Sequence, residues 1–226
     1  MVVGNKSNLW RKKFTLIMLR KKLANSPRKV LKMFQKPLAK FTSKKGKEIE
    51  VVPPSIDRLD DFLGFINRLV AEDTFLSLTG NPKTIEEERL WLKGNIENVK
   101  TGKTIFVWAI CNGKIIGQCD LNRGHARDPH VGTVGLMTDK DFRDEGIGRF
   151  LIEYVLEKAK EMPGLKIIRL HVFSDNAVAI DLYKKLGFSE FARLPNGFYR
   201  KNKYSDALQM YKNLTPTDSP FERGTT

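Results

Sequence analysis

The sequence predicts an α+β domain built on one mixed, mainly antiparallel sheet of about seven strands, with helices on both faces. Three observations lead to this class. From Glu48 onward, short apolar runs typical of strands alternate with longer stretches of helical periodicity. Asn112-Gly113 separates two apolar runs, which is a strong hairpin signal. Segments 131–138 and 167–173 flank a helical stretch, and such a βαβ crossover makes its two strands parallel.

The elements are expected in the order β-α-α-β-β-β-α-β-α-β-β. The strands should cover residues 49–52, 104–110, 114–121, 131–138, 167–173, 188–194 and 204–212, and the helices residues 56–70, 84–99, 146–162 and 176–186. Thr84 with Glu87 three residues later forms a capping box that starts the second helix. If Asn112-Gly113 is a two-residue turn, Cys111 faces Lys114 and Cys119 lies opposite Phe106.

Composition excludes several classes of protein. Two cysteines are too few for a disulfide framework, so we expect reduced cysteines and a cytoplasmic location. The three histidines and two cysteines show no zinc-binding spacing, and no metal is expected. No segment approaches the roughly 18 apolar residues that a membrane-spanning helix requires.

The positive charge is concentrated at the N-terminus. Residues 1–47 contain 15 Lys or Arg and no acid, which leaves 40 − 15 = 25 basic against 26 acidic residues in the remainder. We therefore expect a basic arm over 1–47, partly helical or disordered, a folded domain over 48–212, and a flexible tail over 213–226. Leu31, Phe34, Leu38 and Phe41 would share one helical face, interrupted by Pro37.

The role of this arm stays open at the level of sequence. A solvated extension, a nucleic-acid contact through counterion release, and attachment to a membrane surface through basic amphipathic helices all agree with its composition. A transit peptide is also compatible, although lysine outnumbers arginine and serine is scarce.

The most informative motif is Arg143-x-x-Gly146-x-Gly148, which follows a strand and opens a helix. Glycines at a helix start let a diphosphate approach free N–H groups and the positive end of the helix dipole. A dinucleotide fingerprint would need a third glycine at position 151, which is Leu151. A nucleotide P-loop would need Gly-Lys-Ser/Thr, whereas Arg149-Phe150 follow here.

A second motif lies downstream: Asn176, then Tyr183 seven residues later, then Gly187-Phe188. In this order and spacing, the two motifs resemble those of the GNAT superfamily of acetyl-CoA-dependent N-acetyltransferases, including ribosomal-protein alanine N-acetyltransferases and amino-acid N-acyltransferases. The resemblance covers about residues 48–212. It implies that strands 131–138 and 167–173 splay apart in the centre of the sheet, and that acetyl-pantetheine lies between them.

The resemblance also implies a role for each site residue. Backbone groups of Leu136, Met137 and Thr138 should bind the pantetheine, and Asn176 should contact the cofactor. Tyr183 corresponds to the tyrosine that protonates the departing thiolate, although its helical neighbours would equally suit a core aromatic. The pyrophosphate loop should comprise Arg143, Asp144, Glu145, Gly146, Ile147, Gly148 and Arg149. Its two acids depart from the family pattern, and we expect their side chains to point to solvent while Arg143 and Arg149 offset them.

The general base is less well defined by the motifs. Ribosomal-protein alanine N-acetyltransferases have a glutamate five residues before the Asn, and His171 stands there in this chain. An imidazole, with an ordinary pKa of about 6.5, is a competent base at neutral pH. Many family members carry a carboxylate on the strand before the loop, where this chain has Thr133 and Gly135. The main alternative to His171 as general base is a chain of water molecules that carries the amine proton to other groups.

The acceptor is expected to be a primary amine that attacks directly in a ternary complex. An α-amine has a pKa of about 7.7–8.0 and a lysine about 10.4, so protein N-termini and amino acids are favoured. Glu72 and Asp73 could hold its ammonium group or be solvated loop acids, and Tyr199 with Phe198 and Tyr204 could line its channel or simply pack. The alternatives are a small-molecule amine or polyamine acetyltransferase and a non-catalytic acyl-CoA sensor with a nucleic-acid-binding arm. Sequence does not separate a monomer from a homodimer.

Overall fold

The computed structural model describes residues 37–76 and 80–214. The helices predicted within residues 1–36 and the tail beyond residue 214 lie outside this range. None of the described helices has both the length and the apolar character needed to cross a bilayer.

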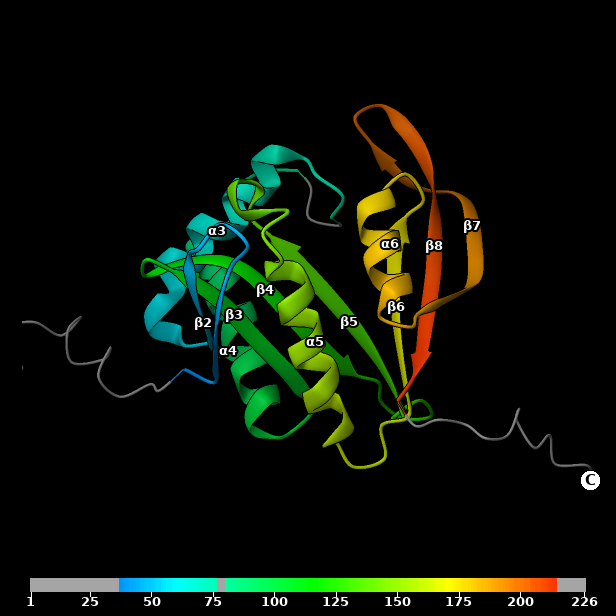
Figure 1. The fold of residues 1–226 in the computed structure, drawn as a ribbon, viewed down its shortest axis with the longest axis horizontal. Coiled ribbons are helices and arrows are strands. Elements are labelled where there is room, and N and C mark those ends of the chain that lie inside the picture. The colour runs from blue at the N-terminus through cyan, green and yellow to red at the C-terminus, as the bar shows by residue number, and fades with distance from the viewer. Residues whose placement is uncertain (1–36, 77–79, 215–226) are drawn as a thin grey trace, which may run out of the picture. The chain divides into compact units, whose positions relative to one another are not determined.

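One eight-stranded sheet organises the described chain, with strand order β1-β2-β3-β4-β5-β6-β8-β7 (Figure 1). The strands are β1 Ala39–Thr42, β2 Glu48–Val52, β3 Thr104–Cys111, β4 Lys114–Arg123, β5 Val131–Thr138, β6 Ile167–Phe173, β7 Ser189–Arg200 and β8 Lys203–Asn213, and the helices are α3 Leu59–Glu72, α4 Ile85–Lys100, α5 Ile147–Lys160 and α6 Ala177–Lys185. Only β5 and β6 pair in parallel, and the other neighbours are antiparallel. The predicted fold class and the position of the parallel pair are confirmed.

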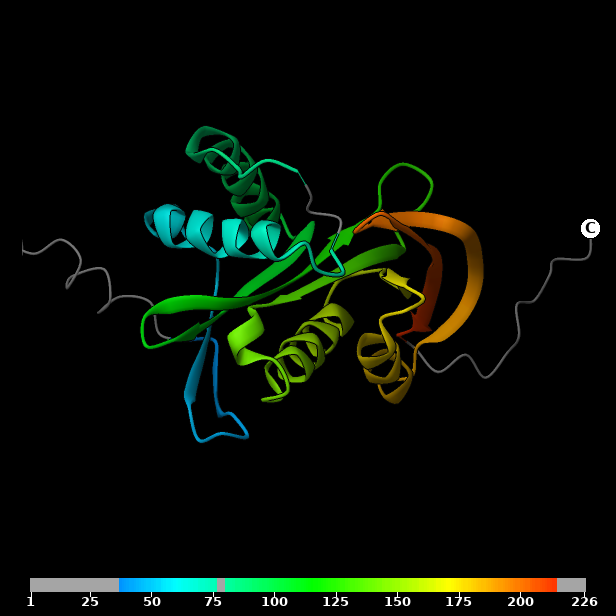
Figure 2. The same cartoon turned by 90° about the horizontal axis from the view of Figure 1, so that it is seen from above.

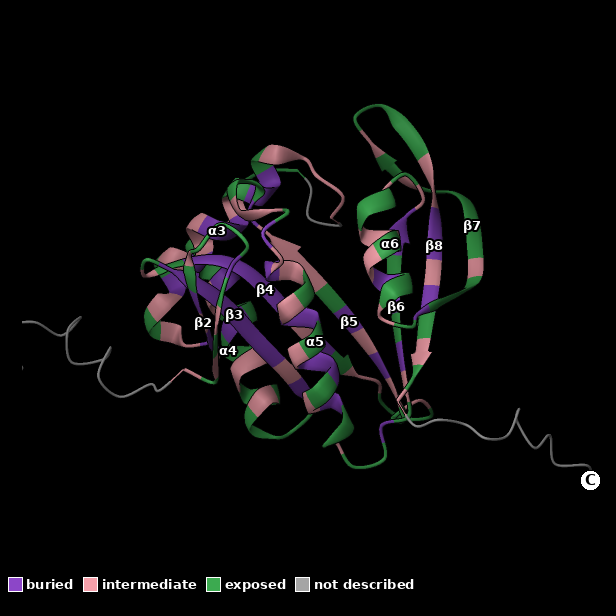
Figure 3. Cartoon of the chain, in the orientation of Figure 1, coloured by how far each residue is buried: buried purple, intermediate pink, exposed green. Residues whose placement is uncertain are grey.

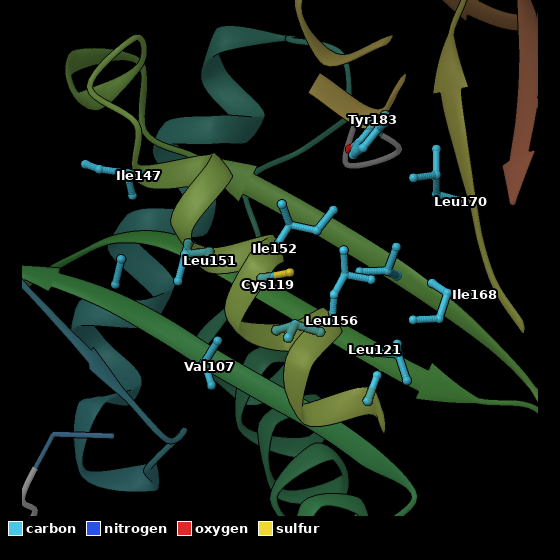
Figure 4. Packing of buried hydrophobic residues seen from close by; sticks show 14 of the residues in the cluster. Val107, Cys119, Leu121, Ile147, Leu151, Ile152, Leu156, Ile168, Leu170 and Tyr183 are labelled. Atoms are coloured by element: carbon cyan, nitrogen blue, oxygen red, sulfur yellow. The ribbon is translucent and has the colours of Figure 1, made fainter. Parts of the chain in front are cut away.

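Two apolar layers cover the two faces of the sheet (Figure 2). Helices α5 and α6 bury Leu151, Val155 and Tyr183 against one face, together with Cys119 and Leu121 of β4 (Figure 4). Helices α3 and α4 bury Phe62, Phe65 and Leu92 against the other face, together with Trp108 of β3. The central strands are therefore buried on both sides, as the purple ribbon of β3 and β4 shows in Figure 3.

The start of helix α4 follows the predicted capping box. The hydroxyl of Thr84 accepts a hydrogen bond from the backbone N–H of Glu87 at 3.3 Å, and the carboxylate of Glu87 accepts one from the N–H of Thr84 at 2.8 Å. Both donors would otherwise lack a partner within the helix. Because this pairing is local, the sequence alone was sufficient to predict it.

The sheet begins earlier than predicted, inside the segment assigned to the basic arm. Ala39–Thr42 pairs antiparallel with β2, so the boundary at residue 47 and the helical face through Leu38 and Phe41 are wrong. The ring of Phe41 stacks on Phe150 of α5 with centroids 4.1 Å apart. Burying this aromatic surface on α5, with the added ladder to β2, favours a strand here over a helix that Pro37 would interrupt.

The β3–β4 hairpin has the predicted turn and a different register. Asn112 and Gly113 both have positive φ, 49° and 79°, as the turn requires. Ile110 pairs with Ile115 but Ala109 pairs with Gly117, so Ile116 is an extra residue in β4. This bulge places Cys119 opposite Val107 rather than the predicted Phe106. Both cysteines are buried free thiols.

Candidate active site

The sheet is split at the parallel pair. β5 and β6 pair at only three positions, Val131 with Ile167, Gly132 with Ile168, and Thr133 with Arg169. Beyond these, β5 stays paired with β4 as far as Thr138, and β6 stays paired with β8 as far as Phe173. A cavity of about 1320 Å³ lies along this divergence and is lined by both strands. The split leaves backbone edges of Leu136, Met137 and β6 without a sheet partner between the strands.

The motif Gly146-Ile147-Gly148 forms the N-terminus of α5 at one end of this cavity. Gly146 has φ 87° and caps the helix without a side-chain hydrogen bond. The first helical bond runs from Phe150 N–H to Gly146 C=O, so the N–H groups of Ile147, Gly148 and Arg149 precede the helical ladder. A Cβ on Gly148 would lie 3.4 Å from Thr138 Oγ1, inside the concavity. These amides and the helix dipole make a cradle for an anion.

The charged side chains of this loop differ from expectation. Arg143 is engaged as a fork: it donates to both carboxylate oxygens of Glu72, at 2.7 Å for Nη2–Oε2, and to the Thr138 carbonyl. Arg149 pairs with Glu153 at 2.8 Å. Neither guanidinium is free to offset the loop acids in the way the sequence predicted, and Glu72 is committed to Arg143 rather than to an ammonium group.

Glu145 is the clearest correction in the loop. Asp144 is exposed as expected, but the Glu145 side chain is fully buried. It accepts hydrogen bonds from Lys47 Nζ at 2.7 Å and Ser43 Oγ at 2.9 Å, both from the β1–β2 turn. The hydrogen bond from Lys47 holds the pKa of Glu145 below its ordinary range, against the effect of desolvation, with a further contribution from Ser43.

Tyr183 and Asn176 occupy the α6 side of the cavity. Asn176 caps α6 by accepting from the Ala179 N–H at 3.2 Å, and both residues line the cavity. Tyr183 is 8% exposed and its ring meets Phe188 edge-on at 5.9 Å, which explains the Gly-Phe pair of the motif as a support for the tyrosine. Burial, and secondarily the neighbouring Cys119, raises the pKa of Tyr183, so the hydroxyl keeps its proton (Figure 4).

The face of the sheet opposite α6 carries a row of residues in β4, β5 and β6 that border the cavity. Asp120 pairs in register with Gly135, and His171 lies two residues beyond Arg169, the last β6 residue paired with β5. Asp120 accepts hydrogen bonds from Gln118 Nε2 at 3.0 Å and Asn122 Nδ2 at 2.6 Å. A Cβ on Gly135 would come within 3.3 Å of the Asp120 carboxylate, so the glycine keeps this space open. Asp120 and His171 both line the cavity.

Asp120 is a functional candidate that the sequence analysis missed. Burial raises its pKa, and the two amide donors counteract this effect. The sequence does contain an indication of this residue: along the predicted strand, the polar Gln118, Asp120 and Asn122 alternate with the apolar Cys119 and Leu121. Such alternation is also typical of any strand with one solvated face, and only the fold reveals that this face borders the cavity.

The remaining predicted acceptor residues are not brought together. Asp73 has φ 47° and ends α3, and its carbonyl accepts from Arg200 Nη1 at 3.4 Å. Tyr199 is 57% exposed and donates its hydroxyl to Asn202 at 3.0 Å. Neither lines the cavity, whereas Phe198 does, stacked on Phe173 at 4.0 Å. Strand alternation explains the difference, because Phe198 and Tyr199 point to opposite faces of β7.

Comparison with known families agrees with this geometry. Residues 68–188, more than half of the chain, match the model of the acetyltransferase (GNAT) family. The chain belongs to the GNAT family. The predicted enzyme class is thereby confirmed at the level of the family, and the matched region contains both the phosphate loop and the Asn176–Tyr183 motif.

Individual relatives are distant. An uncharacterized N-acetyltransferase of Methanocaldococcus jannaschii is 33% identical over 59% of this chain and 58% of its own. The L-amino acid N-acetyltransferase of Escherichia coli is 29% identical over 45% of this chain and 64% of its own, and the ribosomal protein bS18 alanine N-acetyltransferase of Salmonella typhimurium 35% over 33% and 50%. The chain thus spans between half and two thirds of the length of these relatives.

Solved GNAT structures share the fold. A GNAT acetyltransferase of Streptococcus pneumoniae superposes with a TM-score of 0.67 and 26% identity, over 73% of this chain and 98% of the other. A second structure, from Salmonella typhimurium with its cofactor acetyl-CoA, has a TM-score of 0.65 at 15% identity, over 77% of this chain and 98% of the other. The site described above offers free amides suited to a diphosphate, and two unpaired strand edges suited to an extended amide chain.

Proposed function

We propose that this GNAT protein transfers the acetyl group of acetyl-CoA to a primary amine by direct attack in a ternary complex. The observation that carries the proposal is the divergence of β5 from β6 next to the uncapped N-terminus of α5. Amides 147–149 would hold the diphosphate. The edges of Leu136, Met137 and Thr138 would hold the pantetheine amides as a strand partner does. Acetyl-CoA would supply the thioester, and the chain supplies orientation and proton transfer.

Two groups on the sheet face opposite α6 handle the amine. We assign to the Asp120 carboxylate the binding of the incoming ammonium group, because it is held by two amide donors and faces the open space over Gly135. We assign to His171, as the sequence indicates, the removal of the amine proton. The exposed position of His171 lets that proton pass to solvent.

Tyr183 acts from the sheet face that α6 covers. Because burial raises its pKa, the hydroxyl is protonated at neutral pH but is a weak acid. A thiol has an ordinary pKa of about 8.5, so complete proton transfer from Tyr183 is unfavourable, and its role is to donate a hydrogen bond to the departing sulfur.

The favoured acceptors are protein N-terminal α-amines and free amino acids. An α-amine is deprotonated near neutral pH far more readily than a lysine side chain. Two relatives support this direction, since one is named for L-amino acids and another for the alanine of a ribosomal protein. Small-molecule amines such as polyamines are the alternative class.

The test is release of free thiol from acetyl-CoA with panels of N-terminal peptides, amino acids and polyamines. We expect turnover with the first two panels and none with peptides blocked at the N-terminus. Gly148→Glu serves as the inactive control, because its carboxylate enters the anion cradle beside Thr138. Binding of acetyl-CoA without thiol release for any amine would instead identify a non-catalytic acyl-CoA sensor and refute the transferase proposal.

A further inference from the structure

The turn between β1 and β2, residues 43–47, is attached directly to the phosphate loop. Lys44 N–H donates to the Glu145 carbonyl at 3.0 Å, and Ser43 and Lys47 bind the Glu145 carboxylate. The Lys47 ammonium also lies 4.3 Å from the centre of the Phe142 ring. The turn itself precedes the region that matches the family, which begins at residue 68. An accessory hairpin is thus held against the α5 N-terminus.

This attachment sets the course of the Lys44 side chain. Its Cγ and Cε each lie 3.9 Å from the position that a Cβ on Gly146 would occupy, so the chain runs across the face of that glycine. Lys44 is exposed and lines the cavity at the same end as Gly146 and Gly148. The Lys44 side chain therefore lies in van der Waals range of the loop glycine, and it is the φ of 87°, rather than space for Lys44, that favours glycine at position 146.

Charge pairing distinguishes Lys44 from the other cations at this end of the cavity. Arg143 pairs with Glu72, and Arg149 pairs with Glu153 at 2.8 Å. Lys44 enters no ion pair with any acid in residues 37–76 or 80–214. Its neighbours Lys45 and Lys47 are both directed to Glu145, at 3.5 and 2.7 Å. Among the described residues, the Lys44 ammonium group beside the anion cradle is therefore left without a compensating acid.

We propose that Lys44 is a cofactor-binding residue that contacts the diphosphate of coenzyme A, and that Glu145 is a positioning residue that holds the hairpin turn, and with it Lys44, against the phosphate loop. The proposal rests on the proposed function. It explains why an acid stands at position 145 of a loop that binds an anion. The buried carboxylate attracts the lysines of the turn, and the cation is delivered from the N-terminal hairpin instead of from the loop itself.

The test is calorimetric titration of the full-length chain with coenzyme A, which requires no turnover. Lys44→Gln should weaken binding about tenfold, as expected for loss of a charge-assisted hydrogen bond to phosphate, and should reduce the dependence of affinity on ionic strength. Lys44→Arg should restore most of the affinity. Lys40→Gln is the matched control, because Lys40 lies on the same hairpin, pairs with Glu50 at 2.7 Å and does not line the cavity.

Dephospho-coenzyme A, which lacks the 3′-phosphate, identifies the group contacted. If Lys44 binds the diphosphate, Lys44→Gln weakens both ligands equally, whereas a loss seen only with coenzyme A would move the contact to the 3′-phosphate and overturn the assignment. A double-mutant cycle tests the role of Glu145. Glu145→Gln should add little to Lys44→Gln, and fully additive losses would refute positioning through Lys44.

The outcomes separate this proposal from the proposed function. Binding of coenzyme A by the parent chain, with Lys44→Gln equally tight, would refute the role of Lys44 and leave the transferase proposal intact. Failure of the parent chain to bind coenzyme A would refute the proposed function itself. An unchanged melting temperature of Lys44→Gln is expected, because the exposed side chain has no ion-pair partner to lose within the described residues.

Discussion

Replacing Asp120 by asparagine separates binding of the amine from removal of its proton. The carboxylate is held by Gln118 and Asn122 at 3.0 and 2.6 Å, so its geometry is fixed before any acceptor arrives. Asp120→Asn keeps the size of the side chain and removes its charge. If Asp120 holds the ammonium form of the acceptor, the variant loses one hydrogen bond between charged groups.

The size of the effect follows from that contact. A hydrogen bond to a charged group contributes about 1.5–3 kcal/mol, so kcat/KM should fall about ten- to a hundredfold. The loss should appear mainly in KM, because His171 remains to take the proton. The fold should be destabilised by about 1–3 kcal/mol, because the amide nitrogen of the variant faces a donor, either Gln118 Nε2 or Asn122 Nδ2. Burial raises the pKa of Asp120, so its ionised form is a cost to the folded state at neutral pH, and removing the charge offsets part of this loss.

The assay is steady-state thiol release at several pH values, with thermal melting of both proteins. The expected result is a raised KM, a nearly unchanged kcat and an unchanged acidic limb in the pH profile of kcat. His171→Gln is the complementary variant and should lower kcat with little effect on KM. A large fall in kcat for Asp120→Asn, with loss of the acidic limb, would refute this division of roles and make Asp120 the base.

Three further predictions concern Tyr183 and the hairpin. Tyr183→Phe should lower kcat about ten- to a hundredfold through the lost hydrogen bond, and a variant with full kcat would exclude the assigned role. Phe41→Ala should destabilise the fold by about 1–2 kcal/mol through loss of the stack on Phe150, lowering the melting temperature by about 2–8 °C. Lys47 holds the pKa of Glu145 below its ordinary value of 4.5, so this carboxylate stabilises the fold above that pH and the stabilisation is lost on acidification through the lower folded-state pKa. Urea unfolding of Glu145→Gln should therefore depend less on pH below 4.5, and an unchanged pH dependence would contradict the pairing.

Features set by local sequence were predicted well. The Thr84–Glu87 box, the Asn112-Gly113 turn and the 131–138 and 167–173 strands all lie where short-range patterns place them. The two glycines of the phosphate loop and the tyrosine of α6 also meet at one cavity, as their motifs imply. In each case the deciding interaction is close in sequence or is fixed by the order of elements.

Features set by distant contacts were not predicted. Glu145 is buried by a partner 102 residues away, and Arg143 is paired with an acid 71 residues away. β1 lies in a region rich in cations and carries one lysine itself, so composition concealed a strand that its pairing with β2 and its packing on α5 reveal. The β-bulge at Ile116 lies in a hairpin whose Asn112-Gly113 turn is compatible with regular pairing of both strands. No residue type in β4 indicates that the strand contains an extra residue.

The short parallel ladder means that the sheet is two panels joined along a seam of three residue pairs. An extended pantetheine chain bound between β5 and β6 would form hydrogen bonds with the backbone groups that the two strands do not offer to each other, and would so connect the two parts of the sheet. The panel carrying β6, β7 and β8 should then swing less relative to the rest when acetyl-CoA is present. On adding the ligand, amide exchange should slow markedly for the residues of β5 and β6 that lie beyond the three paired positions. The β3–β4 hairpin, whose strands are already paired on both edges, should exchange at the same rate.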